Sequence, residues 1–140
     1  MNVLTFSEGG HGFVIEMSAT LENVDKAAEL VSEKLTGRCG AGEIFRIILG
    51  AREALTNAFL HGSSCDPEKR IRCSVEILNN RLTMEVEDEG AGFDWTARPV
   101  DFPEPDHPGG RGLVIIKTCF DGCSFNEKGN KILLTASKIC

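Results

Sequence analysis

The chain has few aromatic residues and no long apolar segment. Its 140 residues include no tyrosine and a single tryptophan, Trp95, so the aromatic surfaces on which single-stranded nucleic acids stack are scarce. The net charge of −6 offers no electrostatic source for direct nucleic-acid binding. No apolar run approaches the ~20 residues of a membrane span, and residues 1–10 lack the basic and apolar regions of a signal peptide. We therefore expect a cytoplasmic protein that binds neither a membrane nor nucleic acid directly.

Several common site patterns are also missing. The six cysteines form no C-x-x-C pair, which disfavours a zinc site and leaves free, mostly buried thiols as the expectation. Cys119 and Cys123 lie four residues apart, and we expect them to share the core face of one helix. No G-K-[ST] sequence completes a P-loop, and no serine lies at a nucleophile elbow. These absences exclude the commonest phosphate-binding loop and the esterase-type triad.

The length and composition are those of one soluble domain, with 41% hydrophobic and 26% charged residues. Periodicity predicts a helix over residues 21–35 with Ser18 or Thr20 as its cap, and a second helix over residues 42–60. A third helix is expected to begin at Gly112. Alternation predicts strands over residues 3–6, 13–17, 71–77, 82–88, 122–126 and 131–136, with a tight turn at Asn79-Asn80. This order favours an α+β fold, a two-layer sandwich of helices on one face of a largely antiparallel mixed sheet.

The stretch from Phe93 to Pro108 has no regular periodicity. It holds four of the five prolines within about sixteen positions, with the acidic residues Asp101, Glu104 and Asp106 between them. Loops of this length are uncommon inside compact domains and often serve as lids or binding loops.

Two residues of the second predicted helix form the first candidate motif. Glu53 and Asn57 are four apart, so they share one edge of the helix, and His61 follows at the same interval. A carboxamide oxygen is a hard ligand that suits Mg²⁺. A carboxylate one turn away can deprotonate a nucleophile that attacks a phosphoryl group. A solvated helix edge is the alternative.

Asp88, with Gly90 and Gly92 after it, forms the second candidate motif. A carboxylate at a buried strand end needs hydrogen-bond donors, and the exocyclic amine of adenine is a suitable one. Glycines allow tight turning and close approach of the backbone to a flat ring. An ordinary turn at the strand end is the alternative.

A third cluster consists of Gly109, Gly110 and Gly112 at the start of a predicted helix, with Arg111 among them. Backbone amides at a helix N-terminus bind phosphate, and an arginine can add a charge. A plain connection between elements is the alternative.

These three motifs, in this order and spacing, resemble the N, G1 and G2 boxes of the GHKL ATPase superfamily. The segments are EALTNAFLHG (53–62), VEDEGAGFDW (86–95) and GGRGLVIIK (109–117). Within the superfamily, the chain resembles the anti-sigma-factor serine/threonine kinases of the RsbW and SpoIIAB type. The likeness runs from about Phe13 to Ser137 of a single domain spanning residues 1–140, and leaves residues 1–12 as an N-terminal hairpin outside it. Gly129-Asn130 departs from the Gly-Thr of many relatives, so a contact near adenine is expected to differ.

The resemblance implies a Bergerat fold that binds ATP and Mg²⁺. It implies that Asn57 is the Mg²⁺ ligand, that Glu53 is the general base for a serine hydroxyl, and that Asp88 holds adenine. Residues 93–108 would form the ATP lid. The remaining implied ATP-binding residues are Gly90, Gly92 and Phe93 beside the base and Gly110, Arg111 and Gly112 at the phosphates.

The same resemblance implies a protein serine/threonine kinase that phosphorylates a small anti-anti-sigma partner, binds a sigma factor and forms a homodimer. A binding module is the rival, because nucleotide-gated sequestration of a partner needs Asn57 and Asp88 but not Glu53. A third interpretation, an unrelated structural α+β domain, predicts no ATP affinity.

Overall fold

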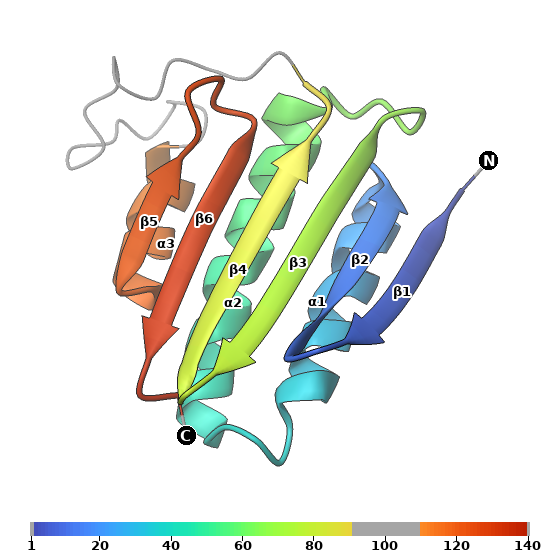
Figure 1. Cartoon of the computed structure of the whole chain (residues 1–140). Helices are drawn as coiled ribbons and strands as arrows, with labels where there is room; N and C mark the ends of the chain where they lie inside the picture. The colour runs from blue at the N-terminus through green and yellow to red at the C-terminus, as the bar shows by residue number, and fades with distance from the viewer. Residues whose placement is uncertain (1, 91–109, 140) are drawn as a thin grey trace.

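The computed structural model describes residues 2–90 and 110–139, which form one six-stranded sheet with helices on one face (Figure 1). The strand order is β1-β2-β3-β4-β6-β5, and each pairing between these strands is antiparallel. The predicted two-layer α+β architecture is confirmed. The strands are β1 Leu4–Gly9, β2 Gly12–Ser18, β3 Arg70–Leu78, β4 Arg81–Asp88, β5 Gly122–Phe125 and β6 Lys131–Ser137. The helices are α1 Leu21–Leu35, α2 Ala41–Asn57, the π-helical turn η1 Ala58–Gly62 and α3 Gly110–Cys119.

The central hairpin of β3 and β4 follows the predicted alternation. Inward-facing residues of both strands, such as Val75 and Met84, are buried and pair across the ladder. Asn79 and Asn80 both have positive φ, at 52° and 64°, which is the geometry of a two-residue turn that matches the twist of the strands. Because the register is fixed at this turn, β4 ends with Asp88 opposite Ile71.

Helix α1 begins and ends at the predicted residues. Thr20 is its cap, because the Thr20 hydroxyl accepts a hydrogen bond from the Asn23 backbone N–H at 3.1 Å. Ser18, the other predicted candidate, ends β2 instead, and its hydroxyl accepts a hydrogen bond from the Val3 N–H at 2.9 Å.

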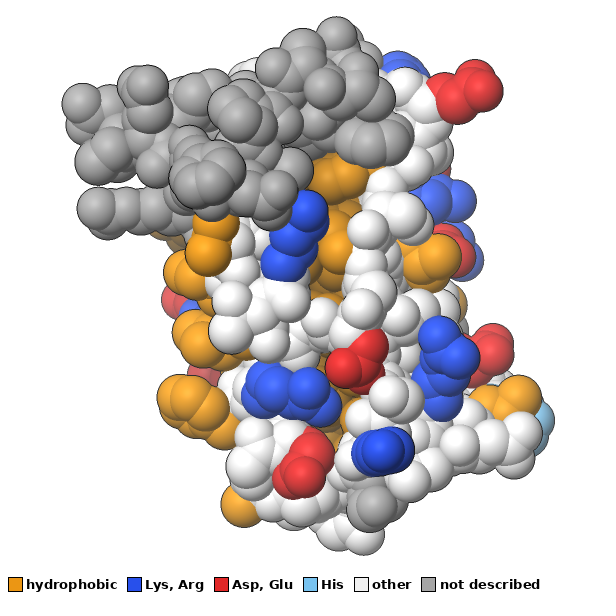
Figure 2. Space-filling model, turned by 90° about the vertical axis from the view of Figure 1, so that its left-hand side faces the viewer, with side chains coloured by type: hydrophobic (Ala, Val, Ile, Leu, Met, Phe, Trp, Pro, Cys, Tyr) orange, Lys and Arg blue, Asp and Glu red, His pale blue; other side chains and the backbone are white. Residues whose placement is uncertain are grey.

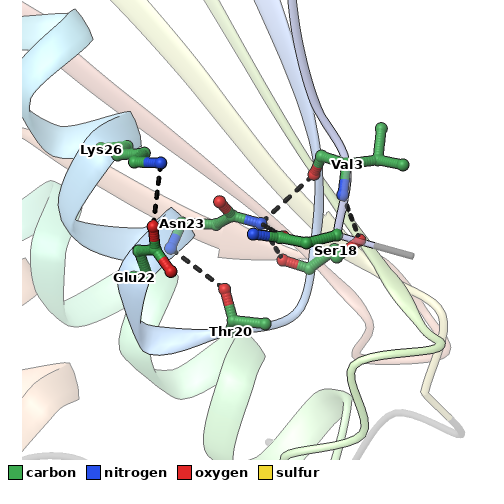
Figure 3. Close-up of polar contacts among 7 residues, drawn as sticks. Val3, Ser18, Thr20, Glu22, Asn23 and Lys26 are labelled. Atoms are coloured by element: carbon green, nitrogen blue, oxygen red, sulfur yellow. Dashed lines mark hydrogen bonds and ion pairs between the residues drawn. The ribbon is translucent and has the colours of Figure 1, made fainter.

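The N-terminal hairpin is part of the main sheet. Figure 3 shows how the buried side chain of Asn23 attaches it to α1: the amide nitrogen donates to Val3 O at 3.2 Å and to Ser18 O at 2.9 Å. The same nitrogen donates to the Asn2 side-chain oxygen at 2.7 Å. β1 is therefore an edge strand that is both paired with β2 and fastened to the helical layer.

The second helix differs from the prediction at its C-terminal end. The α-helical pattern ends at Asn57, and residues 58–62 form a π-helical turn in which Ser63 N donates to Ala58 O at 2.7 Å. Apolar periodicity does not reveal such a change of pitch, because the same residues remain buried. Upstream, Gly50 lets α2 and α3 approach closely, since a Cβ atom there would lie 2.4 Å from the Phe120 ring.

Helix α3 begins at Gly110, two residues before the predicted start, and ends at Cys119. The prediction that Cys119 and Cys123 share one helix face is wrong. The chain turns at Asp121, whose N–H bonds Thr135 O of β6, and Cys123 lies in β5. Among the described residues, no helix is long and apolar enough to cross a lipid bilayer.

Candidate functional site

One cavity lies between the helical layer and the end of the sheet where β4 and β6 meet the α2–η1 junction. Apolar side chains make up most of its wall, and polar groups stand at intervals along it. Figure 2 views the molecule from the side on which β5 and α3 lie in Figure 1. Apolar side chains lie in the upper part of this face, and most of the acidic and basic side chains lie below them. The lining residues are Ala54, Asn57, Ala58, His61, Gly62, Val86, Asp88, Leu113, Ile116, Phe125, Gly129, Asn130, Lys131 and Ile132.

Among the described residues that line this cavity, Asp88 is the acidic one. It is the last residue of β4, and its Oδ1 accepts a hydrogen bond from Gly90 N at 2.7 Å. Burial raises the pKa of Asp88, and the Gly90 N–H opposes that rise only in part. A half-buried carboxylate in an apolar cavity gains free energy from any further N–H donor that enters with a ligand.

Two glycines lie directly against the Asp88 carboxylate. A Cβ atom on Gly62 would lie 2.1 Å from Asp88 Oδ2, and one on Gly90 would lie 1.9 Å from the Gly62 carbonyl oxygen. Neither glycine has a positive φ, so both positions are restricted by space and not by backbone conformation. The end of η1 and the turn after β4 can therefore meet around this carboxylate only because both lack side chains.

Asn57 lies on the same cavity wall as Asp88, at the last residue of α2. Glu53, one turn earlier, is half-buried but is not among the lining residues. Its charge acts on the neighbouring helix: burial raises the pKa of the Cys119 thiol, and the Glu53 carboxylate adds a smaller rise. The structure thus brings Asn57 and Asp88 together and places Glu53 beside them, toward α3.

The turn between β5 and β6 supports Asp88 from the other side. Asp88 N donates to Asn130 O at 2.9 Å, and the Asn130 amide nitrogen donates to Asp88 O at 2.9 Å. The Asn126 side-chain oxygen in turn accepts hydrogen bonds from the N–H groups of Gly129, Asn130 and Lys131. This turn therefore bonds both the N–H and the carbonyl of Asp88.

The other predicted site residues fall in or beside the segment outside the described residues. Gly92, Phe93 and the predicted lid, residues 93–108, lie outside them. The backbone of Gly110, Arg111 and Gly112 forms the first turn of α3, as the phosphate-binding hypothesis requires of a helix N-terminus. Leu113 and Ile116 from the same helix line the cavity.

Two features of the site were missed by the sequence reasoning. The first is Gly62, to which the sequence patterns assign no role although it directly follows the aligned edge of Glu53, Asn57 and His61. The second is Asn126 and its bond to Asn130, since the sequence analysis names Gly129-Asn130 as a point of difference near adenine but does not pair Asn130 with Asn126. Their four-residue spacing around a glycine turn was the available signal, because asparagine side chains bond local backbone N–H groups.

Comparison with known proteins places the chain among nucleotide-binding domains. It is 29% identical over 99 residues to the anti-sigma F factor of Clostridium perfringens, covering 66% of this chain and 71% of that protein. It is 30% identical over 97 residues to the anti-sigma F factor of Clostridium botulinum, covering 64% and 68%.

A solved structure shares the fold. The histidine kinase domain of a blue-light activated histidine kinase from Erythrobacter litoralis superposes with a TM-score of 0.54 at 15% sequence identity, covering 85% of this chain and 59% of that one. Residues 17–136 match the family described as histidine kinase-like ATPase domain. The chain therefore belongs to the histidine kinase-like ATPase domain family.

Proposed function

We propose that this protein is an ATP-dependent serine/threonine kinase of the anti-sigma type, which phosphorylates a small antagonist protein in partner switching. The observation that carries the proposal is the shared cavity of Asn57 and Asp88, because a carboxamide and a carboxylate line one largely apolar cavity. Membership in an ATPase-domain family and the names of the curated relatives support it.

The residues of the cavity fit a purine nucleotide. The Asp88 carboxylate would accept a hydrogen bond from the exocyclic amine of adenine, and the apolar side chains of the cavity lining would contact the flat ring. Gly92 and Phe93 follow in sequence and would complete the base end. At the phosphate end, the first turn of α3, with Gly110, Arg111 and Gly112, would offer backbone N–H groups, and an arginine in this turn would add a positive charge.

Asn57 is the proposed Mg²⁺ ligand. The described residues contain no group of three histidine, cysteine, aspartate or glutamate side chains that could hold a metal by themselves. Mg²⁺ does not need such a group, because it keeps several waters and is commonly held by one or two protein oxygens together with substrate phosphates. The Asn57 carboxamide oxygen suits this role.

Glu53 is the proposed general base. Its carboxylate takes the proton from the serine hydroxyl of the partner, and the serine oxygen forms a bond to the γ-phosphorus of ATP. The bond from that phosphorus to the β–γ bridging oxygen breaks, which leaves phosphoserine on the partner and ADP in the cavity. The antagonist protein is the proposed phospho-acceptor, a sigma factor is the proposed second partner, and a homodimer is the proposed assembly.

A second candidate function has its own support. Glu53 lies outside the cavity lining, whereas Asn57 and Asp88 lie within it. The described geometry is therefore also that of an ATP-binding regulator that sequesters a partner without phosphorylating it.

Phosphotransfer separates these candidates. Wild type, Glu53→Gln and the exposed control Glu33→Gln are incubated with labelled ATP, Mg²⁺ and the cognate antagonist. We expect transfer by wild type and by Glu33→Gln, and a rate about 10²- to 10⁴-fold lower for Glu53→Gln, the usual contribution of a general base. Calorimetry should show unchanged ATP affinity in all three. ATP binding without transfer by any of them would contradict the kinase and leave the sequestering regulator. No ATP binding by wild type would contradict both.

A further inference from the structure

We propose that Asn130 is a positioning residue for the base-reading carboxylate of Asp88, and that Asn126 fixes the orientation of Asn130. The inference rests on the proposed role of Asp88 in binding adenine. It adds two residues whose side chains would set base selectivity without touching the base.

Asn130 holds the backbone of Asp88 from both sides. The paired residues of β4 and β6 end at Glu87 and Lys131, so Asp88 lies one residue beyond the regular ladder. There, Asp88 N donates to Asn130 O and Asp88 O accepts from the Asn130 amide nitrogen, each at 2.9 Å. The side-chain amide of Asn130 therefore supplies the donor that the ladder no longer supplies to the carbonyl of Asp88.

Asn126 determines which way the Asn130 amide faces. The Asn126 amide nitrogen donates to Asn130 Oδ1 at 2.8 Å, while the Asn126 oxygen accepts hydrogen bonds from three backbone N–H groups of the turn. With its oxygen bonded to Asn126, Asn130 must direct its nitrogen to Asp88. The three N–H donors fix the orientation of the Asn126 amide itself, so the whole chain of hydrogen bonds has one direction.

Both polar ends of the Asn130 side chain are thereby engaged, although the residue lines the cavity. Of the two N–H groups of its amide, one donates to Asp88 O, and neither can accept a hydrogen bond from the exocyclic amine of adenine. Asp88 itself is held at two places. Asn130 bonds its backbone, and Gly90 N donates to Oδ1 of its carboxylate. Loosening the backbone end should weaken the bond to an exocyclic amine while leaving the apolar contacts with the ring unchanged.

The test compares ATP with purine riboside triphosphate, which lacks the exocyclic amine, by calorimetry on the full chain. Asn126→Asp keeps the oxygen that accepts the three N–H groups, but replaces the donor to Asn130 with a second oxygen. Asn130→Ala removes the donor to Asp88. We expect each variant to lose about five- to ten-fold in ATP affinity, the effect of one net hydrogen bond. Affinity for the analogue should be unchanged, so the preference for ATP falls by the same factor.

Asn23→Ala is the matched control, because it removes several side-chain hydrogen bonds at the β1–β2 side of the sheet, away from the cavity lining. It should lower stability and keep the wild-type preference for ATP. The inference would be overturned if both Asn126→Asp and Asn130→Ala kept the wild-type preference for ATP over the analogue. It would also be overturned if they lost affinity equally for ATP and for the analogue. If wild type shows no preference for ATP over the analogue, or if Asp88→Asn keeps that preference, the proposed role of Asp88 fails instead.

Discussion

Replacing Gly62 with alanine should damage ATP binding while sparing the fold. The new Cβ atom would lie 2.1 Å from Asp88 Oδ2 and 2.2 Å from Asp88 Cγ. Gly62 does not have a positive φ, so alanine is compatible with the backbone, and the three atoms nearest to the new Cβ all belong to the Asp88 carboxylate. Asp88 is a short side chain bonded to Gly90 N, and it must give way.

The size of the effect follows from the distances. Ordinary van der Waals contact begins at 3.4 Å, so the carboxylate has to withdraw by about 1.3 Å, the difference between 3.4 and 2.1 Å. A hydrogen bond of about 2.9 Å to the adenine amine would lengthen to about 4.2 Å and be lost. Hydrogen bonds to charged groups contribute about 1.5–3 kcal/mol. ATP affinity should therefore fall about ten- to a hundred-fold.

Calorimetric titration with ATP measures this loss, and circular dichroism confirms that the variant is folded. The matched control is Gly42→Ala in α2, where a Cβ atom would meet nothing within 4 Å. That substitution should leave ATP affinity unchanged and raise stability by up to about 1 kcal/mol, because alanine is the better helix former. A folded Gly62→Ala protein with wild-type affinity for ATP would refute the proposal that Asp88 binds the adenine ring.

Two further predictions concern stability. Burial raises the pKa of Asp88 in the folded protein above the ~3.9 of an unfolded chain. At a pH above the raised pKa the ionised carboxylate therefore lowers the free energy of unfolding. This loss disappears as the pH falls below the pKa of the unfolded chain. Asp88→Asn should therefore be at least as stable as wild type at pH 7, with the difference narrowing toward pH 3 in urea unfolding; a pH-independent difference would contradict this. Asn23→Ala should lose about 1 kcal/mol in the same assay, because it removes the amide hydrogen bonds to Ser18 O and Val3 O, while these carbonyls keep the backbone donors Thr20 N and Ser18 N. Full wild-type stability would show that water replaces the Asn23 amide.

The elements that depend on local signals could be predicted from the sequence. The bounds of α1 follow from the Thr20 cap and one apolar stripe, and the β3–β4 turn follows from Asn79-Asn80. The bonds around Asp88 could not be predicted this way. Asn130 meets Asp88 only because β6 pairs with β4, and that pairing joins strands separated in sequence by α3 and β5. Spacing within one segment carries no information about such a contact, so resemblance alone linked the motifs.

The π-helical turn explains why Asn57 and Gly62 can serve one cavity. In an α-helix each residue rotates by about 100°, so positions five apart face directions about 140° from each other. A continued α-helix would have set Gly62 about 140° from Asn57, although about 40° from Ala58, which lines the same cavity. The i→i+5 bonding of a π turn brings positions five apart back to nearly the same side, and the Ser63–Ala58 bond shows this pattern. With the change of pitch at residues 58–62, Gly62 lies against Asp88 while Asn57 lines the same cavity. Five residues of backbone therefore connect the proposed Mg²⁺ ligand, Asn57, to the glycine that contacts the proposed adenine-binding carboxylate.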